Sequence, residues 1–371
     1  MAPLSTAERL ARLRLARSEN VGPVTFRDLL DHFGNAVAAL DALPDLAVRG
    51  GARQSIRIAA AADAEKEIAQ TEKRGGRILV LGDEAFPPRL AALDPPPPVI
   101  SVAGDAALLP KKSIAIVGSR NASAAGRRIA GDMAAALVAE GFVVVSGLAR
   151  GIDTAAHRAS LPGGTVAVLA GGLDIVYPEE NRALQDEIAS QGALVTEMPL
   201  GTSPQARHFP RRNRLISGLS LAVVVVEAAL RSGSLITARF ALEQGRDVFA
   251  VPGSPLDPRA QGANRLIKDG APLVENAADV VAALAEPLGH RFGEPEPPSF
   301  APRDAAPAQA DGPARARILA ALGPTPTPFD ELVRQSGASV PLVRAVILEL
   351  ELAGRIHRDP GDRVSLLPLP D

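Results

Sequence analysis

LAVVVVEAALRSGSLITARFALEQGRDVFAVPGS, residues 221–254, contains two apolar runs separated by a segment of helical length. Neither run alternates between apolar and polar residues, which is typical of strands buried on both faces of a parallel sheet. The segment between them is long enough to carry the chain back across the sheet as a crossover helix. The stretch therefore predicts a strand, a helix and a second, parallel strand.

The same alternation of apolar runs and helical segments extends from Arg77 to about Leu284. Upstream of residue 221, the strand-like runs are RILVLG, SIAIVGS, FVVVSGLA, TVAVLAGG and ALVTEM. Segments of crossover-helix length, such as AGRRIAGDMAAALVAEG, separate them. The pattern predicts an α/β domain with a Rossmann-like, doubly wound, mostly parallel sheet.

Shifts in composition predict three further parts of the chain. Residues 1–74 have helical spacing without a strand signal, which indicates a small helical domain, and SENVGPVTFRDLL within them fits either a helix-hairpin-helix turn or an ordinary bundle turn. We expect a SAM or helix-hairpin-helix-like domain at 1–74, the Rossmann-like domain at 75–290, a Pro/Ala-rich linker at 291–313 and a winged-helix-like domain at 314–371.

The winged-helix prediction rests on three helical segments followed by strand, Pro-Gly turn and strand. In such folds the third helix commonly enters a DNA groove. Here that helix is rich in Val, Leu and Glu and carries one arginine, Arg344. A structural or protein-contact role for it therefore stays open beside groove recognition.

Composition excludes several classes of function. The 371 residues include no cysteine and five histidines, so thiol catalysis, disulfides and zinc-thiolate sites are excluded. The formal net charge of -2 means that a polyanion would need a local basic patch. The chain has no apolar run of membrane-spanning length, and we expect a soluble, cytoplasmic protein without membrane contact, metal or cofactor.

Polar loops follow several of the predicted strands, at the sheet edge where open α/β sheets bind ligands. In the first loop, a serine and the amides of residues 121–123 could donate to an oxyanion, and an arginine offers a bidentate fork. GxGxxG and the P-loop ending are absent, so a plain turn stays an alternative. The candidate anion-binding residues of these loops are Gly118, Ser119, Arg120, Ser146, Gly147, Arg150, Gly151, Ser232, Gly233 and Ser234.

HFPRRNRLISGLS, residues 208–220, places cations at a helix start, where they oppose the helix dipole. Leu215, Ile216 and Leu219 form an apolar stripe that can pack on the sheet. The opposite side would carry Asn213, Arg214, Ser217 and Gly218, with Arg211 at the rim. An anion bound among Arg211, Arg212, Asn213 and Arg214 would account for the placement, and a solvated helix start is the alternative.

One set of residues superficially permits a hydrolase. Ser146, Asp153 and His157 lie close in sequence, but G-x-S-x-G is absent. Asp153 is better explained as the N-cap of the next helix, and His157 as a helix-packing residue. We therefore expect no catalytic residue.

Motifs throughout the chain resemble the DNA-processing protein A family (DprA, also called Smf). They are GSR at Gly118, SGLARGID…AH at Ser146, GGLDIVYPEEN at Gly171, FPRRNRLISGLS at Phe209, VVEAALRSGSLITA at Val225 and VFAVPG at Val248. The resemblance covers all 371 residues and is most specific in residues 113–275.

The resemblance implies a non-enzymatic protein that binds single-stranded DNA, loads RecA during natural transformation and relieves inhibition by single-strand binding protein. It implies a DNA pocket formed by Arg120, residues 146–151, Phe209 and residues 211–214. It also implies a homodimer formed through residues 262–274. Since aromatic residues make up only 3% of the chain, we expect DNA binding to depend mainly on phosphate contacts.

The sequence departs from its relatives at two points. Many relatives have a lysine after YP, where this chain has Glu179 and Glu180, so the lysine's role is either missing or taken by Arg182. Relatives also place a lysine before HFP, and Arg207 is the nearest cation here. These two differences alter the charge of the expected DNA pocket, but the pocket itself is still expected.

Three alternatives remain. Rossmann-like nucleotide N-glycosidases carry a PGGxGT-type loop, and this chain has LPGGTVAV at Leu161, but there the glycines precede a strand. The protein could bind DNA generically without RecA loading. It could also bind duplex DNA through its terminal domains, which the acidic third helix disfavours.

Overall fold

The computed structural model describes residues 3–285, 312–359 and 361–367. Contacts divide the chain into two units, residues 67–298 and residues 1–66 together with 299–371. Most of the expected linker, 291–313, lies outside the described residues, and residues 312 and 313 open a helix. Within the described parts of the chain, no helix is both long enough and apolar enough to cross a membrane.

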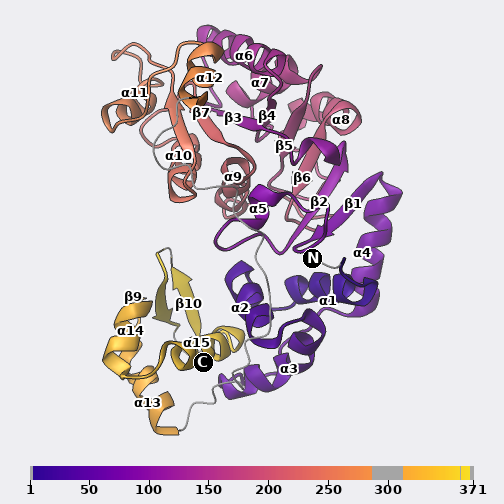
Figure 1. Ribbon diagram of the computed structural model, residues 1–371, viewed down its shortest axis with the longest axis vertical. Coiled ribbons are helices and arrows are strands. Elements are labelled where there is room, and N and C mark those ends of the chain that lie inside the picture. Colours follow the sequence, from indigo (N-terminus) through magenta and orange to yellow (C-terminus); the bar gives the residue numbers. More distant parts are fainter. Residues whose placement is uncertain (1–2, 286–311, 360, 368–371) are drawn as a thin grey trace. The chain divides into compact units, whose positions relative to one another are not determined.

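The larger unit is built on an eight-stranded sheet with the order β1-β2-β6-β5-β4-β3-β7-β8 (Figure 1). All neighbours from β6 to β8 are parallel, while β2 is antiparallel to both β1 and β6. The strands are β1 (Gly76–Val80), β2 (Val99–Gly104), β3 (Ser113–Val117), β4 (Val143–Ser146), β5 (Thr165–Val168), β6 (Ala193–Thr196), β7 (Ala222–Val225) and β8 (Asp247–Ala250). This confirms the Rossmann-like, mostly parallel sheet.

Helices cover both faces of this sheet (Figure 1). On one face, α6 and α7 pack on a core that includes Ile114, Ile116, Val144 and Phe249. On the other face, α9 and α10 contact β5 and β7. The helices of this unit are α4 (Ala61–Lys73, which crosses the division between units), α5 (Pro88–Ala91), η1 (Ala106–Leu108), α6 (Ala124–Ala139), α7 (Ile152–Ser160), η2 (Glu179–Asn181), α8 (Arg182–Gln191), α9 (His208–Leu219), α10 (Gly233–Glu243), α11 (Gln261–Lys268) and α12 (Ala277–Ala285).

The strand order reverses at β3. From β3 the chain adds β4, β5 and β6 on one side, and it then returns to add β7 and β8 on the other. At such a reversal, the loops that follow two neighbouring strands run to opposite faces of the sheet. They leave a crevice at the carboxyl edge, where ligands bind in open α/β folds. The loops after β3, β4, β5 and β7 lie at this edge.

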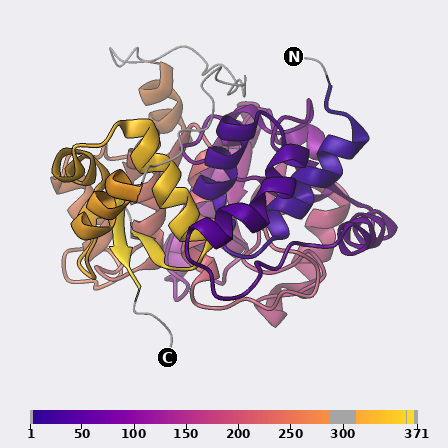
Figure 2. The ribbon, with the colours of Figure 1, turned by 90° about the horizontal axis from the view of Figure 1, so that it is seen from below.

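The smaller unit contains the helical domain and the winged helix, both as predicted. Three helices, α1 (Thr6–Arg17), α2 (Pro23–Phe33) and α3 (Ala36–Arg49), form the first part. The second part has helices α13 (Gly312–Ala321), α14 (Phe329–Ser336) and α15 (Val340–Leu352) with a sheet of β9 (Thr327–Pro328), β10 (Ile356–Asp359) and β11 (Arg363–Leu366) in the order β10-β11-β9. Figure 2 shows α15, in yellow, beside the indigo helices of the first part.

Candidate functional site

The loops after β3 and β4 are joined through Gly151. This glycine has a φ of +79°, and a Cβ added to it would lie 2.3 Å from the carbonyl oxygen of Ser119. The following amide, that of Ile152, donates to the same oxygen at 3.2 Å. Only glycine allows this close approach of two backbones, so the turn after β4 requires a glycine at this position.

The loop after β4 is held in an unusual conformation at Leu148. This buried leucine has a positive φ of 56°, which side chains with a Cβ rarely adopt. Its amide donates to His157 Nε2 at 3.3 Å, and its carbonyl oxygen accepts from Asn181 Nδ2 at 2.9 Å. Hydrogen bonds from two different helical segments thus hold the strained loop in place.

Asp153 holds the loop after β4 in place through hydrogen bonds to its amides. Its Oδ2 accepts from the amides of Gly147 at 3.1 Å and Ala149 at 3.3 Å. The expectation that Asp153 caps α7 is wrong, because Gly151 occupies the N-cap position and Asp153 lies within the first turn. Burial raises the pKa of Asp153, while the nearby Arg212 and the hydrogen bonds oppose that rise.

The polar side-chain atoms of His157 and Ser146 also form hydrogen bonds within the fold. The Nδ1 of His157 lies 2.7 Å from Thr165 Oγ1, whose hydroxyl also contacts the carbonyl oxygen of Val144. Ser146 Oγ donates to the carbonyl oxygen of Ile116 at 2.6 Å. Burial, with a smaller contribution from Arg212, lowers the pKa of His157 to about 3. His157 is therefore a neutral packing residue, as its sequence context suggested.

Arg212 lies beneath the loop after β4. Only 6% of its surface is exposed, and a Cβ added to Gly147 would lie 1.3 Å from its Nη1. Burial lowers its pKa to about 10, with Asp153 raising it and Arg120 lowering it further, so the side chain is charged at neutral pH. Its Nε is buried and has no hydrogen-bond partner among the described residues.

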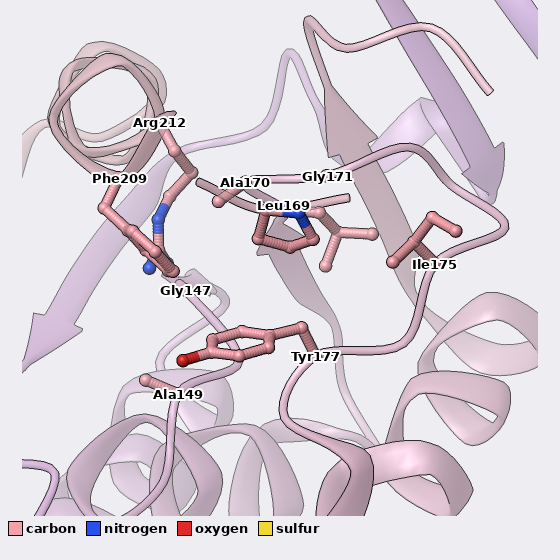
Figure 3. Close-up of a pocket in the computed structure, with 10 residues that line it drawn as sticks. Gly147, Ala149, Leu169, Ala170, Gly171, Ile175, Tyr177, Phe209 and Arg212 are labelled. Atoms are coloured by element: carbon pink, nitrogen blue, oxygen red, sulfur yellow. The ribbon is translucent and has the colours of Figure 1, made fainter. Parts of the chain in front are cut away.

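A pocket opens between this loop, the end of β5 and α9 (Figure 3). The rings of Tyr177 and Phe209 are in tilted contact there, with centroids 5.6 Å apart and planes inclined by 56°. The guanidinium carbon of Arg120 lies 5.1 Å from the centroid of Phe209, and that of Arg212 lies 6.0 Å from it. The lining residues are Gly147, Ala149, Leu169, Ala170, Gly171, Ile175, Tyr177, Pro204, Phe209 and Arg212.

The pocket encloses only about 10 Å³, so a planar ring would stack on the exposed aromatic face at its mouth, beside the arginines. Aromatic side chains provide faces for stacking, and guanidinium groups near a ring interact with its π-system and with phosphate. Tyr177 is 47% exposed. Tyr177 is not among the candidate residues named from the sequence, although its position after a strand, at the carboxyl edge of the sheet, is a usable signal.

The residues of the segment 207–219 differ in their exposure and in their hydrogen bonds. Leu215, Ile216 and Leu219 are buried as predicted. Arg207 and Arg211 are exposed, whereas Arg214 donates to Glu197 at 2.6 Å and to the carbonyl oxygen of Pro95 at 2.9 Å. These partners belong to the fold, so the guanidinium of Arg214 is already engaged.

Asn213 is likewise engaged, since its Nδ2 donates to the carbonyl oxygen of Gly233 at 3.2 Å. The expectation that α9 has one open polar side is wrong. A Cβ added to Gly218 would lie 2.6 Å from Leu93, which shows that the helix is packed on this side as well. Beyond its first turn, α9 is enclosed by the fold.

The amides after β3 have internal partners too. Asn121 N donates to Ser119 Oγ at 3.1 Å, and Ser123 donates to the carboxylate of Glu227 through its amide at 2.9 Å and its hydroxyl at 2.6 Å. Glu227 thus occupies the start of α6, where a phosphate would bind in a dinucleotide site. The expectation that the amides of residues 121–123 bind an external oxyanion is wrong for Asn121 and Ser123, because Ser119 and the carboxylate of Glu227 accept from them.

The loop after β7 lies outside the pocket lining. Ser232 caps α10, accepting from the amide of Ser234 at 3.3 Å, and Gly233 supports Asn213. At η2, Glu179 pairs with Arg182 at 2.7 Å, and Glu180 pairs with Arg150 at 3.4 Å. Arg182 is therefore not a free replacement for the lysine of relatives.

Comparison with known proteins decides the family. The family model described as DNA recombination-mediator protein A matches residues 77–285. The chain belongs to this family. The model of the DprA-like N-terminal HHH domain matches residues 6–69, and that of the DprA winged helix domain matches residues 301–362.

Individual members of the family are similar over most of the chain. Protein Smf of Escherichia coli is 41% identical over 305 residues, which cover 81% of this chain and 80% of that protein. The X-ray structure of DprA from Streptococcus pneumoniae is 36% identical, has a TM-score of 0.64 and covers 76% of this chain and 98% of its own. A DprA structure from Helicobacter pylori, described for its single-stranded DNA binding mode, is 30% identical, has a TM-score of 0.52 and covers 56% of this chain and 95% of its own.

Proposed function

We propose that the protein binds single-stranded DNA in the pocket between Tyr177 and Phe209 and acts as a recombination mediator that loads RecA onto incoming DNA in natural transformation. The observation that carries this proposal is the pair of neighbouring aromatic rings with two arginines close to Phe209. The family membership and the single-stranded DNA binding of the H. pylori relative support it.

In this proposal a base stacks at the rings, and the adjoining phosphates contact exposed cations. Arg120 extends over Phe209, and Arg207 and Arg211 are exposed at the start of α9. Arg212 supplies a buried positive charge at the pocket wall. Stacking therefore adds to the phosphate contacts that the sequence alone led us to expect, and it favours strands whose bases are free.

Binding is tested by fluorescence anisotropy with oligo-dT over a series of salt concentrations. We expect Phe209→Ala to weaken binding by about tenfold, since one stacking contact is worth about 1–3 kcal/mol.

Arg120→Ala should reduce the affinity. It should also lower the salt slope by about 0.7 for each phosphate that the variant no longer neutralises. Arg239→Ala is a matched control, because Arg239 also lies over a phenylalanine, Phe240, but outside the pocket. Equal binding by Arg120→Ala, Arg239→Ala and the parent would refute the pocket assignment.

RecA loading is tested separately, by measuring RecA filament formation on DNA coated with single-strand binding protein. The mediator proposal expects faster filament formation when the protein is added, and slower formation with Phe209→Ala. A protein that binds DNA but leaves the rate unchanged would be a generic single-stranded DNA binder.

The proposal includes no catalytic step. The engaged Ser146, the neutral His157 and the loop-bound Asp153 support this, since none of them is exposed to a ligand in the pocket. Release of free base from nucleoside monophosphates would instead favour the N-glycosidase alternative.

A homodimer is also part of the proposal. The expected dimer segment, residues 262–274, contains the exposed Leu273. Sedimentation should give twice the chain mass for the parent and a monomer for Leu273→Glu, because a charge at an apolar interface is costly to bury. A monomeric parent would exclude the dimer.

A further inference from the structure

A second depression lies on the other side of the loop after β4. It is an open groove of about 330 Å³ between α6, α7 and η2. Its lining includes Arg127, Arg150, Arg158 and Glu180, together with Thr154 and Asn181. Three cations and one carboxylate thus face the same space.

The groove and the aromatic pocket share a wall. In the loop after β4, Gly147 and Ala149 line the pocket, whereas Arg150 and Gly151 line the groove. In the segment after β5, Tyr177 lines the pocket, and Glu180 and Asn181 line the groove. A chain that leaves the pocket over this loop therefore enters the groove.

The shared wall is rigid. Asn181 Nδ2 donates to the carbonyl oxygen of Leu148 at 2.9 Å and contacts Thr154 Oγ1 at 3.0 Å. Thr154 Oγ1 in turn donates to the carbonyl oxygen of Ala149 at 2.8 Å. Because these bonds join η2, α7 and the loop, the two depressions keep a fixed spacing, which suits successive groups of one ligand.

The cations in the groove are only weakly neutralised. Arg127 uses Nη1 to donate to the carbonyl oxygen of Ala122, and Arg158 is exposed with no ion-pair partner among the described residues. The pair between Arg150 and Glu180 is 61% and 54% exposed. Exposed pairs of this kind contribute little, so a phosphate can take the place of the carboxylate.

We propose that this groove is a second phosphate-binding subsite, which holds the backbone of the same DNA strand next to the nucleotide in the aromatic pocket. Glu180 lies among the arginines and weakens binding there. The inference rests on the proposed function, since it needs a strand that begins in the pocket. The phosphate ester is the recognised group, and it could also come from a free nucleotide.

The test compares a dT dinucleotide with a dT oligomer of about twenty residues, since the dinucleotide has a single phosphate that stays at the pocket and the long strand continues into the groove. We expect the double variant Arg127→Ala/Arg158→Ala to bind the long oligomer about five- to tenfold more weakly, with a salt slope lower by about 1.4 because two phosphates are no longer neutralised. Binding of the dinucleotide should not change. Glu180→Gln should strengthen binding of the long oligomer only.

Arg128→Ala is the matched control. Arg128 is adjacent to Arg127 on α6, is 84% exposed and pairs with Asp132, but it does not line the groove. The substitution removes the same kind of charge from the same helix, so we expect no length-dependent effect. A loss in Arg128→Ala equal to that in the double variant would overturn the subsite, because the effect would then be one of net charge.

Two further outcomes are distinct. If the parent binds neither oligomer, the proposed function fails, and the inference fails with it. If the parent binds both and the double variant retains the parent's affinity for the long oligomer, only the subsite is overturned. In a third experiment, binding of thymidine monophosphate is measured. If the double variant loses this binding but binds the long oligomer as the parent does, the groove is a site for free nucleotides and not for the DNA strand.

Discussion

At the scale of single residues, the pocket depends on a buried charge. Arg212 lies against Gly147, and its charge is opposed by Asp153, which in turn holds the amides of the loop after β4. A buried cation is costly unless partners compensate it. Its Nε is buried without a hydrogen-bond partner among the described residues, so this compensation is incomplete.

Gly147→Ala tests this packing. The new Cβ would overlap the position of Arg212 Nη1, so the buried arginine must move. We expect the free energy of unfolding to fall by about 1–3 kcal/mol and oligo-dT binding to weaken. Gly131→Ala on α6 is the control, because its nearest neighbouring atom would be 3.8 Å away and alanine favours a helix. Unchanged stability and binding in Gly147→Ala would contradict the position of Arg212.

His157 predicts a dependence of stability on pH. Its pKa is lowered from 6.5 to about 3 in the folded protein, so the unfolded chain binds more protons between these values. Stability should therefore fall as pH decreases below about 6.5, by up to about 1.4 kcal/mol per pH unit from this residue. The pKa of Asp153 is raised in the folded protein, so this residue lowers stability as the pH rises above the ordinary pKa of an aspartate.

Denaturant unfolding between about pH 4.5 and 7 isolates the contribution of His157 when the parent is compared with His157→Gln. The variant should show the shallower decline in stability toward low pH. Parallel curves for the two proteins would mean that folding does not lower the pKa of His157.

At the scale of elements, Glu227 has a role that no local pattern predicts. It lies at the end of the β7 region, and its carboxylate binds Ser123 at the start of α6, so it joins the two sides of the strand-order reversal. Negative charge at a helix start is favourable. The protein thus fills a position that other doubly wound folds leave for phosphate.

Glu227→Ala should lower the free energy of unfolding by about 2–4 kcal/mol, because two hydrogen bonds to a charged group are removed. Glu243→Ala, which removes an exposed carboxylate paired with Arg239 on α10, is the control and should change it by less than about 0.5 kcal/mol. Both are measured by thermal or denaturant unfolding. Equal effects of the two substitutions would contradict the bridging role.

Sequence patterns predicted most elements, and the exceptions have physical causes. The strand β2, Val99–Gly104, was missed because it directly follows a run of prolines. The apolar stripe of α9 follows from helical periodicity, and its burial is confirmed. The engagement of Arg214 could not be predicted, since its partners Glu197 and Pro95 come from remote segments.

At the scale of the whole molecule, the smaller unit joins the two ends of the chain. Arg358 of the winged helix donates to Asp28 at 2.9 Å and to Glu351 at 2.8 Å, and all three side chains are largely buried. A Cβ added to Gly50 would lie 1.9 Å from the carbonyl oxygen of Glu349 on α15. The third helix of the winged helix therefore packs on the helical domain, and periodicity alone could not predict this packing between sequence-distant parts.

Arg358→Ala should destabilise this unit by about 3 kcal/mol, because it leaves two buried carboxylates without their cation. Arg334→Ala is the control, since Arg334 forms an exposed pair with Glu331 on α14. Hydrogen exchange of the amides in α3 and α15 measures the effect. We expect faster exchange in both helices for Arg358→Ala, and exchange that rises only in α15 would show that the two parts unfold independently.

Binding of single-stranded DNA in the aromatic pocket is tested by photocrosslinking of oligo-dT that carries 5-iododeoxyuridine, followed by mass spectrometry of the crosslinked peptides. Binding in the aromatic pocket predicts crosslinks at Tyr177 and Phe209, whose rings lie in contact there. Crosslinks confined to the winged helix, with neither aromatic residue modified, would contradict the account.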